Sequence, residues 1–246
     1  MTDEVKKQLA DGLAALRLSP EPEALEKLAL YCDRLLEKNE VMNLTAITDP
    51  AEVVRLHFLD SAALLPSRAL HGKRIIDVGT GAGFPGLVLK ILDPTIEVTL
   101  FDTLGKRIAW LQELCGELGL SGVTCVKGRA EEFGRDPAYR ERYDAAVSRA
   151  LAAMPVLAEL CMPFVKPGGL FLAMKSNKTD EEIAAAEKRI LTLGGKLPFV
   201  MDYRLPGDET IYHRIVTVYK ESSTPKAYPR RWAKIKEEAE AGKQQS

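Results

Sequence analysis

The sequence predicts an α/β protein with a Rossmann-like sheet, mostly parallel, that closes with an antiparallel hairpin and follows a set of N-terminal helices. Three observations support this fold class. An apolar run, Arg74–Val78, leads into a glycine-rich turn and a helix-like segment, and from there short β-type runs alternate with helical ones. The last two runs are joined through a proline-glycine turn within Leu205–Asp208. Such alternation is typical of a parallel sheet covered by helices, and a short turn joins antiparallel strands.

The first 65 residues carry apolar side chains at helical spacing in about three pieces. We expect helices at Thr2–Leu18, at residues 22–38, and from Asp49 to about Leu65, with a short connector at Asn43–Ile47. Pro22 favours a helix start because proline suits the first helical position. The run Asp49–Glu52 resembles a capping box, with an acidic residue three positions after the cap.

The remaining elements follow from turn residues between apolar runs. The expected strands are Arg74–Val78, Glu97–Phe101, Val123–Lys127, Asp144–Ser148, Leu170–Lys175, Lys196–Asp202 and His213–Lys220. The expected helices begin at Pro85 or lie at Leu104–Leu118, near Met154–Met162 and at Thr179–Leu193, and a short turn is expected through Arg129–Phe133. We therefore expect an N-terminal helical extension over residues 1–70, a main domain over 71–221 and a basic, then polar, tail over 222–246.

Asp77 and the glycines that follow it form the turn after the first of these strands. Glycine accepts positive φ and lets a ligand approach the backbone closely, and open α/β sheets bind nucleotide-like ligands at such strand ends. We predict a cofactor pocket here, with Asp77, Gly79, Gly81 and Gly83 among its residues. A structural turn without a ligand is the plain alternative.

Two cofactors compete for this turn. The run Gly81–Gly86 matches the dinucleotide fingerprint G-x-G-x-x-G, which is weak alone. The longer run also matches hydrophobic-Asp-hydrophobic-Gly-x-Gly-x-Gly, the first motif of S-adenosylmethionine-dependent methyltransferases. The second is favoured because Pro85 removes an N–H that a pyrophosphate needs and because the Asp77 carboxylate suits the ammonium of a methionine group. The closing hairpin agrees, since a dinucleotide fold would end in a sixth parallel strand.

Asp102 follows the second strand of the sheet, 23 residues after Gly79. An acidic residue at about this distance is placed to accept hydrogen bonds from ribose hydroxyls. Asp102 could instead cap the helix that starts near Leu104, and both roles are compatible.

Composition narrows the functional classes. With 246 residues, 46% of them hydrophobic, the chain can bury one full core plus a small extension. No apolar run is long enough to span a membrane, and the charged N-terminus lacks a signal-peptide core, so we expect a cytoplasmic protein without a membrane partner. The four cysteines have no C-x-x-C spacing, which makes metal binding and a disulfide framework unexpected.

The net charge of −1 does not indicate nucleic-acid binding, but residues 226–236 concentrate basic side chains. Five lysines and arginines stand there without an acid, with Tyr228 and Trp232 between them. Such a segment could contact phosphates and stack on bases, and a solvated tail that contacts nothing is an equal alternative.

The chain resembles the bacterial small-subunit (16S) ribosomal RNA guanine-N7 methyltransferases, also called the glucose-inhibited division B family. The matching segments are Asn43–Ser61, Asp77–Gly86, Asp102–Arg107, Gly128–Phe133, Val147–Ala150 and Tyr228–Arg230. The resemblance covers nearly the whole chain and implies a class I methyltransferase fold. It also implies a guanine in the decoding-region loop of 16S rRNA as target, with the naked RNA or the small ribosomal subunit as partner.

The resemblance further implies site residues for S-adenosylmethionine. These are Gly79 and Phe84 in the turn, Asp102, Ala130 and Glu131 after the third strand, and Arg149 after the fourth, near the cofactor or the target base. The tail departs from the family pattern, because family members usually end shortly after further basic and proline residues. We therefore expect residues 237–246 to be disordered.

The position after the fourth strand favours attack by a ring nitrogen. Amino-directed methyltransferases carry an Asn/Asp-Pro-Pro-aromatic run there, whereas this chain has Val147–Ala150, and no Pro-Cys pair offers the nucleophile of a cytosine-C5 enzyme. Guanine N7 has a lone pair and no proton, so its methylation needs alignment and no general base. Arg149 is our candidate catalytic residue, holding guanine O6, a phosphate or the carboxylate of the cofactor. The alternative is a salt bridge from Arg149 to Asp144 or Glu131.

Other residues receive weaker predictions. Basic residues near strand ends could line an RNA-facing rim: Lys106, Arg107, Lys127, Arg129 and Lys175. His57 is more readily read as a buried structural histidine than as a catalytic one. The acidic N-terminal helices are expected to cover the pocket rather than to bind RNA.

Three other functions stay open at this point. A methyltransferase acting on a small molecule or a protein would share the cofactor pocket. A nicotinamide-dependent oxidoreductase would use the glycine turn for a dinucleotide. A non-catalytic RNA-binding ribosome-assembly factor would bind RNA without transferring a methyl group.

Overall fold

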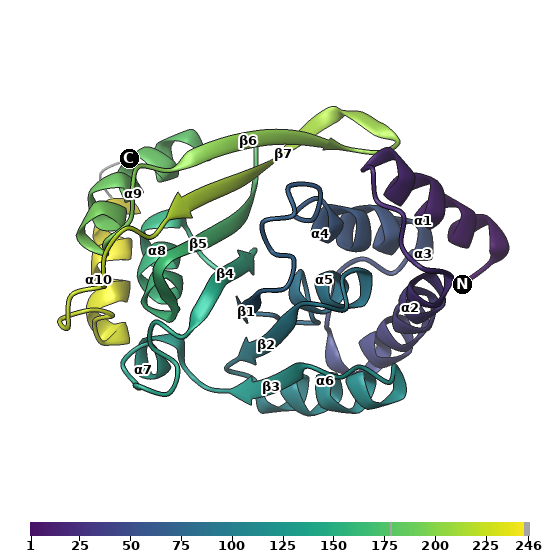
Figure 1. The fold of residues 1–246 in the computed structure, drawn as a ribbon, viewed down its shortest axis with the longest axis horizontal. Helices are drawn as coiled ribbons and strands as arrows, with labels where there is room; N and C mark the ends of the chain where they lie inside the picture. Colours follow the sequence, from purple (N-terminus) through teal and green to yellow (C-terminus); the bar gives the residue numbers. More distant parts are fainter. Residues whose placement is uncertain (178, 244–246) are drawn as a thin grey trace.

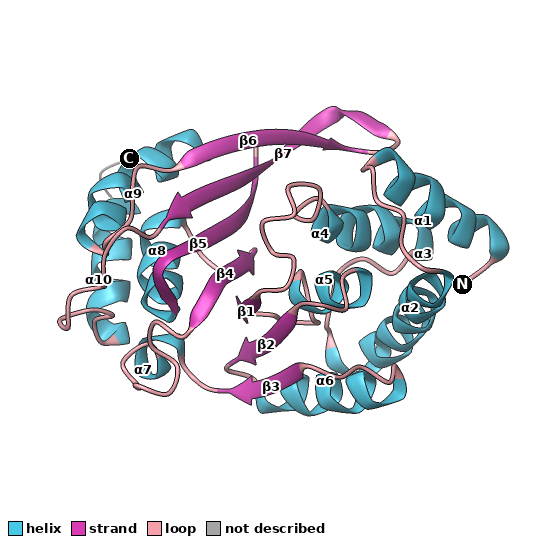
Figure 2. Cartoon of the chain, viewed as in Figure 1, coloured by secondary structure: helices cyan, strands magenta, loops and turns pink. Residues whose placement is uncertain are grey.

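A seven-stranded sheet forms the centre of the computed structural model, which describes residues 1–177 and 179–243. The strands are β1 (Arg74–Val78), β2 (Glu97–Asp102), β3 (Val123–Lys127), β4 (Tyr143–Arg149), β5 (Val165–Ser176), β6 (Phe199–Leu205) and β7 (Asp208–Tyr219). Their order across the described sheet is β3-β2-β1-β4-β5-β7-β6 (Figures 1 and 2). The first five strands are parallel, and β7 runs antiparallel to both β5 and β6. The predicted fold class is confirmed.

Helices cover both faces of the sheet, as Figure 1 shows. The helical segments are α1 (Asp3–Ala15), α2 (Pro22–Met42), α3 (Pro50–Val53), the π-helical η1 (Val54–Leu59), α4 (Asp60–Ala62), α5 (Gly86–Leu92), α6 (Gly105–Glu117), α7 (Ala130–Phe133), α8 (Met154–Cys161), η2 (Met162–Phe164), α9 (Asp180–Thr192) and α10 (Trp232–Lys243). Successive strand residues point to opposite faces, so Ile75 lies in a core with α1–α6 and Ile76 in a second core with α8–α10.

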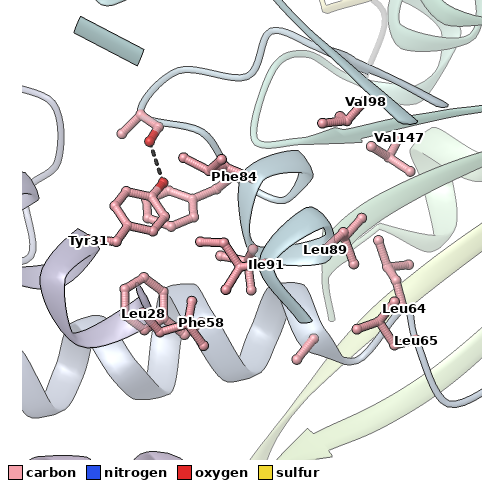
Figure 3. Packing of buried hydrophobic residues seen from close by; sticks show 14 of the residues in the cluster. Leu28, Tyr31, Phe58, Leu64, Leu65, Phe84, Leu89, Ile91, Val98 and Val147 are labelled. Atoms are coloured by element: carbon pink, nitrogen blue, oxygen red, sulfur yellow. Dashed lines mark hydrogen bonds between the residues drawn. The ribbon is translucent and has the colours of Figure 1, made fainter. Parts of the chain in front are cut away.

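The N-terminal helices pack directly on the glycine turn. Tyr31 of α2 is fully buried, and its hydroxyl donates a hydrogen bond to the carbonyl of Ala82 in that turn (Figure 3). The rings of Phe58 and Phe84 lie 5.3 and 5.4 Å from the ring of Tyr31. Residues 1–70 therefore share one core with the sheet, and they hold the turn from outside.

The third N-terminal helix differs from the sequence prediction in its middle. It runs from Pro50 to Ala62, but Val54–Leu59 is π-helical. Only half of the expected capping box forms. The Asp49 carboxylate accepts a hydrogen bond from the backbone N–H of Glu52 at 3.0 Å, whereas the Glu52 carboxylate binds Arg55.

Three strand predictions near the end of the chain had the wrong bounds. β5 begins at Val165 rather than Leu170, because the Pro-Gly-Gly segment bulges within the strand and shifts its register against β4 after Tyr143. The closing hairpin exists as expected, but β6 starts at Phe199 and β7 extends back to Asp208. The long alternating run of β7 pairs with both neighbours, which the sequence of either strand alone does not reveal.

The expectation of disorder over residues 237–246 was wrong for its first part. Helix α10 continues to Lys243, and residues 244–246 lie outside the described chain. The helix is held because Ile235 is only 2% exposed and Glu238 forms ion pairs with Arg189 and Arg230.

All four cysteines are free thiols. Over the described residues, none of the helices has the length and apolar character to cross a bilayer. The same residues contain no group of three or more His, Cys, Asp or Glu side chains arranged to hold a metal ion.

Candidate active site

A cavity of about 520 Å³ opens at the carboxyl ends of β1, β2, β3 and β4. Its wall combines the loops after these strands with the N-terminal helices and the C-terminal segment. The lining residues are Leu44, Thr45, His57, Val78–Ala82, Phe84, Phe101–Thr103, Arg107, Arg129–Glu131, Arg149–Leu151, Leu160 and Trp232. Its volume and position are those of a ligand site at the strand ends of an open α/β sheet.

The first three glycines of the turn differ in what surrounds them. Gly79, Gly81 and Gly83 all have positive φ, at 75°, 59° and 104°. A Cβ on Gly81 would meet only the carbonyl of Gly79 at 4.0 Å, so this position borders open space and lets a ligand reach the backbone. A Cβ on Gly83 would lie 2.6 Å from the hydroxyl oxygen of Tyr31. Gly83 does not line the cavity, and its small size serves the packing of α2.

Asp77 lies beneath the turn, fully buried, and does not line the cavity. One carboxylate oxygen accepts hydrogen bonds from the hydroxyl of Thr80 at 2.7 Å and from the N–H of Gly86 at 2.8 Å. The other accepts none from the described residues. Burial raises the pKa of Asp77 to about 6, against the opposing effect of these bonds. The geometry gives Asp77 a part in shaping the turn, and the expected ammonium contact stays a prediction.

Asp102 connects the second strand end to the glycine turn. Its Oδ2 accepts a hydrogen bond from the N–H of Gly81 at 3.0 Å, and its Oδ1 accepts one from Leu104 at 2.9 Å. Helix α6 begins at Gly105 and has no side-chain cap. Asp102 therefore does not cap this helix, which was its alternative predicted role. Asp102 lines the cavity with lone pairs to spare, because an ionised carboxylate offers about four.

The loop after β3 adds two of the predicted residues. Ala130 and Glu131 both line the cavity, and both are mostly buried. Glu131 accepts a hydrogen bond from the Nε of Arg129 at 2.6 Å. The ring of Trp232 lies against the same arginine, with its centroid 5.7 Å from the guanidinium carbon.

Arg149, at the end of β4, is hydrogen-bonded to the N-terminal helices. Its Nη1 donates to Asp60 at 2.8 Å and to the carbonyl of Leu56 at 2.9 Å, and its Nη2 lies 3.1 Å from Nδ1 of His57. The guanidinium also stands 5.0 Å from the centroid of the Phe84 ring. The alternative prediction, a salt bridge from Arg149 to Asp144 or Glu131, was wrong. Arg149 pairs with Asp60, whereas Asp144 binds Lys166 and Glu131 binds Arg129.

Asp60 is the buried centre of this cluster, and the sequence alone did not reveal its role. It is 4% exposed, and besides Arg149 it accepts hydrogen bonds from the hydroxyl of Tyr203 at 2.6 Å and from His213, whose Nδ1 is 3.1 Å away. Burial alone would raise the pKa of Asp60, but these donors and the charge of Arg149 hold that pKa below its ordinary value.

A smaller cavity of about 260 Å³ adjoins the main one at Arg149 and Ala150. It continues over β5 and β7 and is also lined by Asp60, Met174–Ser176, Tyr203 and His213. Ala150, which borders both cavities, has a φ of 54°, a conformation uncommon for a residue with a side chain. Such strained residues cluster at functional sites.

Comparison with known proteins identifies the family of the chain. The sequence pattern of the GidB family, described as rRNA small subunit methyltransferase G, matches residues 24–209.

The chain belongs to the GidB family.

Relatives within the GidB family are similar over most of their length. The ribosomal RNA small subunit methyltransferase G of Symbiobacterium thermophilum is 49% identical, over 91% of this chain and 93% of that protein. Those of Desulfitobacterium hafniense and Alkaliphilus oremlandii are 48% and 46% identical, over 84% and 96% of this chain and 85% and 98% of theirs. A solved methyltransferase from Pyrococcus furiosus shares the fold, with a TM-score of 0.54, 14% identity and coverage of 80% and 99%. The family resemblance is confirmed.

Two arginines of the predicted rim of this GidB-family chain, Arg107 and Arg129, line the main cavity. Lys175 lies in the smaller cavity, where Glu182 and the carbonyl of Ala152 bind its ammonium. Lys106 and Lys127 are exposed. An RNA-facing role for these residues stays a prediction.

Some of the basic and aromatic side chains of the tail bind within the protein and are therefore not free to contact RNA. Arg230 is bound by Glu159, and the ring of Tyr228 lies against Arg189 and Arg230. The other basic residues of the segment are exposed, namely Lys226, Arg231, Lys234 and Lys236.

His57 stacks on Phe84 at a centroid distance of 4.5 Å, and its Nε2 lies 2.8 Å from the hydroxyl of Thr45. Burial, with the adjacent charge of Arg149, lowers the pKa of His57 to about 4. Both ring nitrogens are engaged, which agrees with a structural role more than with proton transfer.

The low pKa of His57 predicts that the difference in stability between the wild type and His57→Asn depends on pH. The unfolded chain binds a proton at His57 below about pH 6.5, whereas the folded chain does so only below about pH 4. The stabilisation from neutral His57 is therefore complete above pH 6.5 and lost as the pH falls toward 4, by roughly 3 kcal/mol. Urea unfolding of the wild type and His57→Asn should show the difference between the two shrinking over this window. Because Asp77 titrates oppositely in the same range, only this difference is informative. A pH-independent difference would contradict the assignment.

Proposed function

We propose that this chain transfers the methyl group of S-adenosylmethionine to N7 of a guanine in small-subunit ribosomal RNA. The observation that carries the proposal is the pair of adjoining cavities that meet at Arg149, one on the strand ends of β1–β4 and one beyond them over β5 and β7. A methyl donor fits the first and a flipped base the second. The names of the GidB-family relatives support the rRNA substrate, which would place the reaction in the cytoplasm.

The residues of the main cavity suit S-adenosylmethionine. Asp102 would accept hydrogen bonds from the ribose hydroxyls, and the open backbone at Gly81 would let the ligand approach the turn. Ala130 and Glu131 would border the adenine, while Gly79, Phe84 and Arg149 would surround the methionine portion. When bound, the cofactor supplies a methyl group already activated by its sulfonium.

The surroundings of Arg149 suit a nucleophile that needs no deprotonation. Of the five N–H donors of an arginine, three are used by Asp60, Leu56 and His57, which leaves two to hold guanine O6 or a phosphate. His57 is neutral with both nitrogens engaged, so it is a poor general base. Guanine N7 carries a lone pair and no proton, and alignment alone can supply about 7–11 kcal/mol of the barrier.

The target guanine would have to leave its stack to reach this site, which favours a loop over a duplex. We propose the decoding-region loop of 16S rRNA, as the family resemblance implies. The smaller cavity would receive the base, with Asp60, held by Tyr203 and His213, keeping Arg149 in place at its entrance.

The experiment that tests this function is transfer of labelled methyl from S-adenosylmethionine to small ribosomal subunits and to naked 16S rRNA. Both acceptors would come from cells that lack the activity, and the product nucleoside would be identified by mass. We expect 7-methylguanosine, and the better acceptor identifies the partner. Another methylated nucleoside would overturn the N7 assignment. Cofactor binding without transfer to either acceptor would overturn the RNA substrate and redirect the search to small molecules and proteins.

A further inference from the structure

The C-terminal segment, residues 224–243, is fastened to the sheet domain by a buried carboxylate. Glu159 of α8 is 1% exposed. It accepts hydrogen bonds from the Nε and Nη2 of Arg230, at 2.9 and 2.8 Å, and from the backbone N–H of the same residue at 2.7 Å. Arg189 of α9 binds the same carboxylate at 2.6 Å. Charge-assisted hydrogen bonds of this bidentate kind are strong. Because Arg230 lies two residues before α10, they fix the position of the start of that helix.

Two further arginines secure the chain that leads into α10. Arg135 and Arg140 donate hydrogen bonds to five backbone carbonyls, those of Thr224, Pro225, Ala227, Tyr228 and Pro229. Backbone carbonyls bound by guanidinium groups in this way need no regular secondary structure to be satisfied. The segment is therefore held by the connection between α7 and β4, and α7 itself contributes Ala130 and Glu131 to the lining of the main cavity.

This anchoring places Trp232 on the wall of the main cavity. The indole is 40% exposed, and it lies against Arg129, the residue that follows β3. In the sheet order β3-β2-β1-β4, Arg149 stands at the β4 end of the cavity, Asp102 at β2, and Arg129 with Trp232 at β3. A nucleoside whose reacting end is at Arg149 and whose ribose is at Asp102 would extend its base toward Trp232.

We propose that Trp232 is the aromatic wall against which the adenine of the cofactor stacks, so that the C-terminal segment completes the cofactor cavity. The proposal rests on the proposed function for the identity of the cofactor. An indole presents a large flat surface to a purine, and stacking of this kind contributes about 1–3 kcal/mol per base. The other aromatic contact that the tail composition indicates, stacking on an RNA base, would occur on the same ring and is the competing outcome.

The chain has two tryptophans, which makes the test direct. The ligand is S-adenosylhomocysteine, titrated calorimetrically into the full chain while tryptophan emission is recorded. Trp110 of α6 is 6% exposed and packs in the core, so Trp110→Phe is the matched control. We expect emission to be quenched on binding in the wild type and in Trp110→Phe, but not in Trp232→Phe. We expect Trp232→Leu to raise Kd about 5- to 100-fold and Trp232→Phe to stay within about threefold, since a phenyl ring also stacks.

The possible results distinguish a wrong role for Trp232 from a wrong cofactor. Unchanged Kd in Trp232→Leu, with a raised KM for RNA, would overturn the proposal and assign the indole to the RNA. Absence of binding by the wild type would overturn the cofactor itself, and the role of Trp232 with it. Should Trp232→Leu unfold, the affinity and emission of Trp232→Phe and Trp110→Phe still decide, because loss of quenching with near-normal Kd is expected only if Trp232 touches the ligand.

Discussion

Replacing Arg149 by alanine should lower methyl transfer by at least about 100-fold, because a shift of about 1 Å in the reacting groups can cost that much. The guanidinium contacts His57, Asp60 and the Phe84 ring, so its loss loosens the whole β4 end of the cavity. The structure predicts a loss of about 3–5 kcal/mol as well, because Asp60 loses a partner in a buried pair. Single-turnover transfer and urea unfolding measure the two effects.

Arg214→Ala is the matched control for Arg149→Ala. Arg214 of β7 is 7% exposed and pairs with two carboxylates, those of Asp202 and Asp180, which are themselves exposed, and it lines neither cavity. Its removal should cost stability and leave transfer per folded molecule unchanged. Equal losses of transfer in the two variants would show that Arg149 acts only through the fold.

Gly83→Ala should destabilise the chain by about 2–6 kcal/mol. The φ of 104° is strained for any residue with a Cβ, which costs about 1–3 kcal/mol. The new methyl would also lie 2.6 Å from the Tyr31 hydroxyl and 3.1 Å from Leu87 and Leu111, and such overpacking costs about 1–3 kcal/mol. Because domains are stable by only about 5–15 kcal/mol, the midpoint of urea unfolding should fall markedly.

Gly81→Ala separates the ligand role of the turn from its packing role. Its Cβ would point into open space at a φ of 59°, so we expect about 1–2 kcal/mol of strain but a clear loss of cofactor affinity in calorimetry. A valine at this position would be strained for the same reason, because a positive φ is especially unfavourable for a β-branched residue. Unaltered affinity in a folded Gly81→Ala protein would place the ligand elsewhere.

The parts of the fold that the sequence predicted are those decided locally. Strand β3 matches its predicted bounds because an apolar run lies between a glycine turn and a charged turn. The bulge in β5 and the long pairing of β7 depend on neighbours that are distant in sequence, such as Lys220, whose backbone pairs with Gly168 and Gly169. The helix at the C-terminus depends on Glu159, about 70 residues upstream.

The candidate site also has parts that the sequence predicted and parts that depend on residues distant in sequence. Gly81, Asp102, Ala130, Glu131 and Arg149 converge on one cavity because the carboxyl ends of parallel strands share an edge of the sheet. What Arg149 binds could not be predicted, since Asp60 lies 89 residues away on a helix whose π-helical stretch has no sequence signal. Trp232 had a signal, an aromatic among basic residues, but that pattern indicated RNA rather than the cavity wall.

The anchoring of the C-terminal segment by Glu159 also has a consequence for biosynthesis. Residues 224–243 are synthesised last, after the strands of the sheet and the N-terminal helices. The wall that Trp232 supplies to the main cavity is therefore the last part of that cavity to be made, after the glycine turn, Asp102 and Arg149. A polypeptide that ended before residue 224 would lack Arg230, the partner of Glu159, and the Trp232 side of the cavity, so its cavity would be incomplete.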